Sequence, residues 1–167
     1  MLIVFYTKKI FLITFLLLIS CKSNNTKKNR LTDLESLQSK STFINLSKQE
    51  VDLNLFSNKK IILNYWATWC GPCIKEMPDL IIAEKKLKDS DVSLFLVSDE
   101  DVSVISKFVD NNQYTLNFLK SNVSNEMLGV YSLPTTILFD NKGNKVETIV
   151  GVLDFSDENL INKFLKY

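Results

Sequence analysis

The chain has 167 residues, of which 46% are hydrophobic and 23% are charged, and its formal net charge is +1. These values fit one globular domain with its own core, and they give no indication of a nucleic-acid partner or an acidic substrate. The sequence contains no histidine, which excludes Ser-His-Asp and Cys-His catalysis and imidazole metal sites. Any proton transfer must therefore involve carboxylates, lysine, cysteine, tyrosine or water.

Residues 1–20 are predicted to be a signal peptide. Lys8 and Lys9 precede an apolar stretch over residues 10–19, which is too short to span a bilayer comfortably but suits a signal h-region. The stretch ends in Leu-Ile-Ser before Cys21. This ending resembles a bacterial lipobox, in which the signal is cleaved before the cysteine and the cysteine carries lipid. The alternative is an uncleaved signal anchor with an incidental cysteine, and both interpretations predict an exported, tethered domain.

The segment after Cys21 is polar and lacks periodicity, so residues 21–40 are predicted to form a lipidated N-terminus and a flexible tether. Leucines at helical spacing within it predict a short helix that packs on the domain: Leu31, Leu34 and Leu37. The folded domain is predicted to span residues 41–167.

From residue 41 onward the pattern predicts alternating strands and helices. The runs STFINL and VDLNL, on either side of residues 47–50, predict a β-hairpin. Further strand-like runs cover residues 60–66, 92–97, 133–139 and 145–151. Apolar residues at helical spacing predict helices after Cys70, from Val102 and around Leu160. The order ββ, βαβα and ββα predicts an α/β fold, with a central mixed sheet and helices on both faces.

Two cysteines separated by two residues, Cys70 and Cys73, allow three chemistries. A structural zinc site needs about four ligands, and one pair without histidine does not supply them, so we expect no metal. A purely structural disulfide is a poor explanation as well. Closing roughly four residues stabilises a fold by about 2 kcal/mol, against about 3 kcal/mol for a loop of fifteen.

The third chemistry, thiol–disulfide exchange, fits the local pattern. A buried strand ends near Trp66, and Cys70 then falls at a helix N-terminus, where free N–H groups and the helix dipole favour a thiolate. Pro72 lies in the first turn, where its missing N–H costs nothing. Cys73 follows one helical turn later, so its sulfur can attack a mixed disulfide formed at Cys70.

The run WATWCGPC resembles the active site of the thioredoxin superfamily, and SLPTTILF resembles the cis-proline loop of that superfamily. The resemblance implies a thioredoxin-like fold with a cis peptide bond before Pro134. It also implies that Leu133 presents its backbone to an extended substrate peptide. The alternative for Pro134 is an ordinary proline at a strand entry.

A closer resemblance is to the membrane-tethered TlpA/ResA-like and cytochrome c maturation thiol–disulfide oxidoreductases. It is carried by NYWATWCGPCIKEMPDL and covers about residues 41–167, including the N-terminal hairpin. In that branch the glutamate matching Glu76 lies near the active site and influences the cysteine pKa values, so Glu76 is a candidate for pKa tuning or proton transfer; the alternative is a solvated helix residue. Thioredoxins often carry aspartate where this chain has Asn64, which we expect only to form hydrogen bonds within its strand region.

The remaining candidates surround the cysteines. Trp69, Gly71 and Pro72 are expected to contact the substrate. Glu100 and Asp101 follow a strand end, where they either border the site or form an acid cluster at a helix N-terminus.

The sequence therefore predicts a protein disulfide reductase in which Cys70 attacks and Cys73 resolves, with no cofactor beyond this redox-active pair. One alternative is a weak oxidant or isomerase on the same fold, and another is a non-enzymatic, lipid-anchored binding module. A peroxiredoxin-type peroxidase is disfavoured, because its P-x-x-x-[ST]-x-x-C pattern is absent: Thr68 precedes Cys70 by two residues instead of three.

The resemblance also implies partners and a location. The expected substrates are disulfides in exported proteins, including the CxxCH sites of apocytochromes c. The expected electron donor is a membrane thiol–disulfide protein. The chain is expected to be a monomeric lipoprotein that faces the periplasm and is held to the membrane at Cys21.

Overall fold

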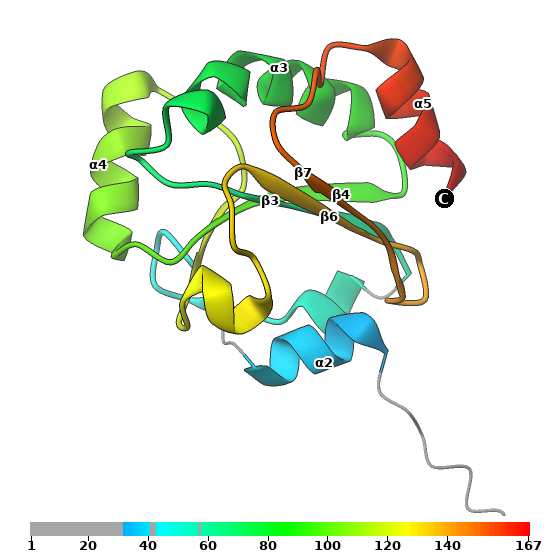
Figure 1. Cartoon of the computed structure of the whole chain (residues 1–167), viewed down its shortest axis with the longest axis horizontal. Coiled ribbons are helices and arrows are strands. Elements are labelled where there is room, and N and C mark those ends of the chain that lie inside the picture. Colours follow the sequence, from blue (N-terminus) through cyan, green and yellow to red (C-terminus); the bar gives the residue numbers. More distant parts are fainter. Residues whose placement is uncertain (1–31, 41–42, 57) are drawn as a thin grey trace, which may run out of the picture. The chain divides into compact units, whose positions relative to one another are not determined.

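A mixed sheet of seven strands lies at the centre of the computed structural model, which describes residues 32–40, 43–56 and 58–167 (Figure 1). The strands follow the order β2-β1-β5-β4-β3-β6-β7. β3, β4 and β5 run parallel, and the other neighbours pair antiparallel. Their bounds are β1 Phe43–Asn45, β2 Glu50–Val51, β3 Lys60–Tyr65, β4 Val92–Ser98, β5 Phe118–Ser121, β6 Thr135–Phe139 and β7 Lys145–Val150.

Helices cover both faces of this sheet, as the sequence predicted (Figure 1). The bounds are α2 Asp33–Lys40, α3 Gly71–Leu87, α4 Val102–Asn112 and α5 Glu158–Lys166, with short 3₁₀ helices η1 Leu53–Phe56 and η2 Asn125–Leu128. Apolar residues of α3, α4 and α5 share one core with one face of the sheet. Residues of α2 and η1 form a second core on the other face.

Strand β3 explains how the reactive segment is positioned. Ile62 and Trp66 enter the core beneath α3, whereas Ile61, Leu63 and Tyr65 enter the core on the α2 side. Because both faces of this strand are covered, apolar residues follow one another from Ile61 to Leu63 instead of alternating with polar ones. The chain leaves β3 at the sheet end where Tyr65 pairs with Thr135 of β6, and it reaches the N-terminus of α3 within a few residues.

The sequence-based assignment of strands is wrong at two places. The four-residue strand β5 was not predicted, because only two of its residues are apolar and its pairing with β1 and β4 supplies the rest of its stability. The run after Val51 does not continue as a strand but forms η1. Asp52 explains this turn, since its side chain accepts from the Asn54 N–H at 2.9 Å and so competes with strand pairing. β1 and β2 pair antiparallel over two residue pairs.

The folded unit includes α2 and extends to Tyr167, whereas the predicted boundary at residue 41 places α2 in the tether. Leu34 and Leu37 of α2 are buried, and the Leu34 N–H donates to the carbonyl of Gly143, in the β6–β7 turn, at 2.9 Å. Gly143 has a φ of 76°, which strains any other residue, and a Cβ there would lie only 3.0 Å from Thr32 Oγ1. The predicted signal peptide, Cys21 and the first part of the tether lie outside the described residues. Within the described ranges, no helix is both long and apolar enough to cross a bilayer.

Candidate active site

Cys70 is the N-cap residue of α3, which begins at Gly71. Its backbone is extended, and its Sγ accepts a hydrogen bond from the Cys73 N–H at 3.3 Å. Pro72, in the first helical turn, has no N–H to satisfy. The Cys70 sulfur therefore lies where the free N–H groups and dipole of α3 stabilise negative charge.

A disulfide joins Cys70 to Cys73, with the two Cα atoms 5.3 Å apart. Cys73 is fully buried, whereas Cys70 keeps 5% of its surface exposed. In this oxidised state the exposed fraction of Cys70 is therefore small. Of the two cysteines, only Cys70 therefore has surface that solvent can reach in this state.

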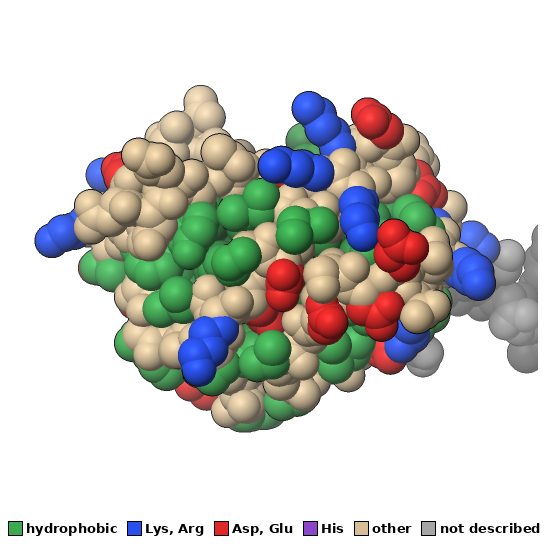
Figure 2. Space-filling view, turned by 90° about the horizontal axis from the view of Figure 1, so that it is seen from above, with side chains coloured by type: hydrophobic (Ala, Val, Ile, Leu, Met, Phe, Trp, Pro, Cys, Tyr) green, Lys and Arg blue, Asp and Glu red, His purple; other side chains and the backbone are tan. Residues whose placement is uncertain are grey.

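An exposed rim surrounds Cys70. Trp69 is 74% exposed, and Gly71 and Pro72 are also exposed. Hydrophobic side chains gather on this face of the molecule, over α3 and α4, with acidic side chains next to them (Figure 2). The rim therefore offers an apolar surface beside Cys70.

The Leu133–Pro134 segment ends at the same edge of the sheet. Its peptide bond is cis, and it precedes Thr135, which pairs with the last residue of β3. Leu133 is half-buried and packs against the core that contains both cysteines, while Pro134 is buried. The structure thus brings the predicted proline loop to the end of β3 from which the cysteine segment departs.

Glu76 is buried, with 2% of its surface exposed, so it is not a solvated helix residue. Asn64 Nδ2 donates to Glu76 Oε1 at 2.9 Å, and the Leu153 N–H donates to Oε2 at 3.2 Å. Burial raises the pKa of Glu76, the hydrogen bonds from Asn64 and Leu153 lower it in part, and the charge of Asp79 raises it again. Glu76 lies three residues, about one helical turn, after Cys73 on α3.

The link between Asn64 and Glu76 was missed by sequence reasoning, which expected Asn64 to bond within its own strand region. Twelve residues separate the two positions, and a spacing of that length carries no periodic signal. A polar residue inside the apolar run of β3 was the available clue, because a buried amide needs partners.

Glu100 borders the site from the loop between β4 and α4. Its two carboxylate oxygens accept from the N–H and the hydroxyl of Thr68, two residues before Cys70. Asp101 is the N-cap residue of α4, but its side chain makes no capping hydrogen bond. Of the two acids that the sequence singled out, only Glu100 binds the cysteine segment.

Residues 29–148 match the AhpC/TSA family. The chain belongs to that family. Among curated proteins, it is 36% identical over 111 residues to the thiol-disulfide oxidoreductase ResA of Bacillus thuringiensis (strain Al Hakam). That match covers 64% of this chain and 63% of the relative, so the chain spans less than two thirds of the length of that protein.

Solved structures show that this AhpC/TSA-family chain has a thioredoxin-like fold. The thioredoxin domain of a thiol-disulfide oxidoreductase from Bacteroides vulgatus superposes with a TM-score of 0.64 at 25% identity, covering 74% of this chain and 91% of that one. StoA from Bacillus subtilis superposes with a TM-score of 0.60 at 22% identity, covering 72% and 92%. The resemblance read from the cysteine motif is therefore confirmed for family and fold.

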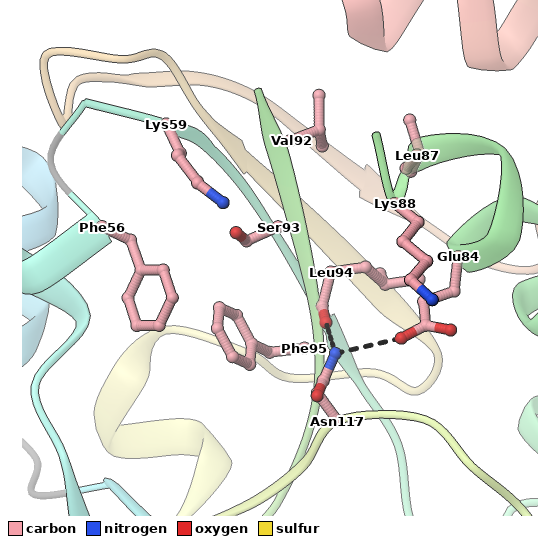
Figure 3. A pocket seen from close by; sticks show the side chains of 10 residues that line it. All are labelled: Phe56, Lys59, Glu84, Leu87, Lys88, Val92, Ser93, Leu94, Phe95 and Asn117. Carbon is pink, nitrogen blue, oxygen red and sulfur yellow. Dashed lines mark hydrogen bonds between the residues drawn. The ribbon is translucent and has the colours of Figure 1, made fainter. Parts of the chain in front are cut away.

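A hollow in the surface of this chain lies away from the cysteines. It has a volume of about 240 Å³ and opens between the start of β4 and the end of α3 (Figure 3). At its wall Asn117 Nδ2 donates to Glu84 Oε1 at 3.2 Å and to the Leu94 carbonyl at 3.3 Å (Figure 3). Because Lys59 and Val92 line it at the starts of β3 and β4, it lies at the opposite end of these parallel strands from Cys70. No cysteine lines it, so it is not part of the redox site.

Proposed function

We propose that the chain is an extracytoplasmic thiol–disulfide oxidoreductase that reduces disulfides in exported proteins. The observation that carries the proposal is the Cys70–Cys73 pair, with Cys70 as the partly accessible N-cap residue of α3. The names of the relatives support the same reaction class. Apocytochromes c with CxxCH sites are proposed as one group of substrates, on the resemblance of the motif alone.

The reaction begins from the reduced pair. The Cys70 thiolate attacks one sulfur of the client disulfide, that S–S bond breaks, and a mixed disulfide forms while the first client sulfur leaves as a thiolate and takes a proton. The Cys73 thiol then loses its proton and attacks the Cys70 sulfur. The second client sulfur leaves, and the Cys70–Cys73 disulfide forms. Two electrons pass to the client, which is left as a dithiol. A membrane thiol–disulfide protein then supplies two further electrons, and its own dithiol is oxidised to a disulfide as the Cys70–Cys73 pair is reduced.

Glu76 is proposed to accept the proton that Cys73 releases. Its burial favours the neutral acid, so an ionised Glu76 readily takes up a proton from a neighbouring thiol. A negative carboxylate also opposes a second negative charge on Cys73, which leaves the thiolate at Cys70. Trp69, Gly71 and Pro72, together with Leu133 and Pro134, are proposed to contact the client chain on either side of its disulfide.

Membrane attachment through a lipid on Cys21 is part of the proposal, and it rests on the sequence pattern before that residue. Its test is metabolic labelling with a fatty acid. The full chain should take up label, and the Cys21→Ser variant should not. Labelling that is equal in both chains would remove the lipid anchor from the proposal.

The decisive test of the activity is trapping. In a Cys73→Ser variant the mixed disulfide at Cys70 cannot be resolved, so client proteins should accumulate on Cys70 and be identified by mass spectrometry. The double variant Cys70→Ser/Cys73→Ser is the control. If both variants recover the same proteins, the proposed reaction is wrong.

The direction of transfer needs a separate measurement. A reduction potential of the pair near the value of thioredoxin, about −270 mV, agrees with a reductase, whereas a value near that of DsbA, about −120 mV, would make the chain an oxidant.

A further inference from the structure

The side chain of Asn64 joins Glu76 to the sheet. Its Nδ2 group donates to Glu76 Oε1 at 2.9 Å and to Thr136 Oγ1, on β6, at 3.2 Å. Asn64 and Thr136 are fully buried, and Glu76 is nearly so. One amide nitrogen therefore connects β3, α3 and β6 directly beneath the first turns of the helix that carries the cysteines.

The oxygen of the same amide is unpaired. Asn64 Oδ1 is buried and meets no donor among the described residues. Such a group is uncommon in a protein interior and requires an explanation. The oxygen and nitrogen ends of a carboxamide have nearly the same shape, so a half-turn of the Asn64 amide exchanges donor for acceptor inside the same space.

That half-turn matches the two charge states of Glu76. An ionised Glu76 offers only acceptor atoms, and Asn64 Nδ2 supplies the donor that Oε1 needs. A neutral Glu76 protonated on Oε1 offers an O–H donor instead, and the turned amide presents Oδ1 to accept it. The Thr136 hydroxyl both accepts and donates, so it can bond either end of the amide. In each state one end of the amide is paired and the other is not.

We propose that Asn64 is the positioning residue for a proton held on Glu76: its amide donates to the ionised carboxylate and, after a half-turn, accepts from the neutral acid. The purpose of this device rests on the proposed function, in which Glu76 exchanges its proton with Cys73. The hydrogen-bond exchange itself requires no client. Leucine at position 64 could neither donate to the ionised carboxylate nor accept from the neutral acid. An ionised aspartate there would repel the carboxylate.

The groups around Glu76 allow a titration of its carboxyl group to be interpreted. Asp79, on the same helix, is the charged neighbour that acts on Glu76. From β3 and the loop after β7, Glu76 accepts from neutral groups, the Asn64 amide and the Leu153 N–H. On β6 the neutral Thr136 hydroxyl bonds the Asn64 amide. In the oxidised protein the cysteines form a disulfide and do not ionise. A titration of this state therefore reports the Asn64–Glu76 pair without the thiols.

The test is an NMR titration of the oxidised chain, with ¹³C in the Glu carboxyl groups and ¹⁵N in the Asn amides. The two side-chain N–H signals of Asn64 should shift with the same midpoint as the Glu76 carboxyl carbon. In Glu76→Gln that shift should vanish. Asn125, a second buried asparagine with an unpaired Oδ1, is the internal control, and its signals should not follow Glu76. Asn64 signals that stay constant while Glu76 titrates would overturn the proposal.

Two variants extend the test. In Asn64→Asp, which keeps the shape of the side chain, and in Asn64→Leu, the Glu76 carboxyl should titrate at higher pH than in the unaltered chain, because the ionised form has lost its donor. An unchanged midpoint in the folded Asn64→Asp variant contradicts the proposal even if Asn64→Leu fails to fold.

The same chains separate this proposal from the proposed function. If the titrations are coupled but Glu76→Gln reduces client disulfides with an unaltered pH profile, the Asn64 device stands and the proton route to Cys73 is wrong. If Glu76→Gln changes that profile while the two titrations are unrelated, the proton route stands and the Asn64 device is wrong.

Discussion

Thr68 and Glu100 are joined by two hydrogen bonds, each 2.7 Å long, from the N–H and the hydroxyl of Thr68 to the two carboxylate oxygens of Glu100. The Ser98 hydroxyl donates to the same carboxylate at 3.1 Å. Thirty-two residues separate the pair, so the contact ties the segment before Cys70 to the end of β4. Cys70 is thus flanked by two supports, the helix that follows it and the contact of Thr68 with an acid in the loop after β4.

Removing this carboxylate should loosen the segment before Cys70. We expect Glu100→Ala to lower the free energy of unfolding by about 2 kcal/mol, because bonds to a charged group are lost and a half-buried N–H is left unpaired. Client reduction should slow as well. Urea denaturation of the oxidised protein measures the first effect. Asp101→Ala is the matched control, since Asp101 makes no capping bond, and equal losses in both variants would contradict the prediction.

Glu76 should make stability depend on pH. Its pKa is raised in the folded chain, so the folded state binds a proton more tightly than the unfolded state. The stabilisation from this proton is complete below the usual value of 4.5 and is lost as the pH rises through the folded pKa.

The variant Glu76→Gln cannot ionise, and it should gain stability relative to the unaltered chain as the pH rises from 4 to 8. Urea midpoints of the oxidised proteins measure the difference at each pH. A constant offset, such as the altered bond to the Leu153 N–H, does not affect this slope. A difference that is independent of pH would show that burial does not perturb Glu76.

The two tryptophans of the motif should behave differently. Trp69 is 74% exposed and Trp66 is fully buried. Trp69→Ala should leave the unfolding free energy within about 0.5 kcal/mol of the unaltered chain while raising KM for a client. Trp66→Ala should cost about 3–5 kcal/mol, because it empties a packed core. Denaturation and steady-state kinetics separate the two effects, and an unchanged KM in Trp69→Ala would remove Trp69 from the client surface.

The disulfide should contribute little to folding. It spans a sequence separation of three, and closing so short a loop stabilises a protein by about 2 kcal/mol in the chain-entropy model. Reduction should therefore leave the domain folded, with a modestly lower urea midpoint. Circular dichroism with and without reductant measures this, with the Cys70→Ser/Cys73→Ser chain as a reference that cannot form the bond. Unfolding on reduction would favour the structural role that the short spacing argues against.

Most of the fold could be predicted from local sequence patterns. The covered strand β3 is predictable because Ile61, Ile62 and Leu63 form an apolar run that resumes at Tyr65, and α3 because its buried residues recur on one side. β5 was not readable, since Phe118 and Leu119 alone make no pattern and the strand depends on pairing with β1 and β4.

The candidate site, too, could be predicted from the sequence only in part. Cys70 and Cys73 are close in sequence, so their relation is visible without a structure. The contacts of Glu76 with Asn64 and of Glu100 with Thr68 join segments that only the fold brings together. Their chemistry therefore depends on tertiary structure that no local spacing encodes.

The hydrogen bond from the Leu34 N–H to the Gly143 carbonyl holds α2 against the turn between β6 and β7. Gly143 lies in the turn at one end of β6, and Pro134 precedes the other end, a strand length of about 17 Å away at roughly 3.4 Å per residue. The described chain begins at Thr32, against that turn. The start of the described chain and the end of the sheet from which the cysteine segment departs therefore lie a strand length apart.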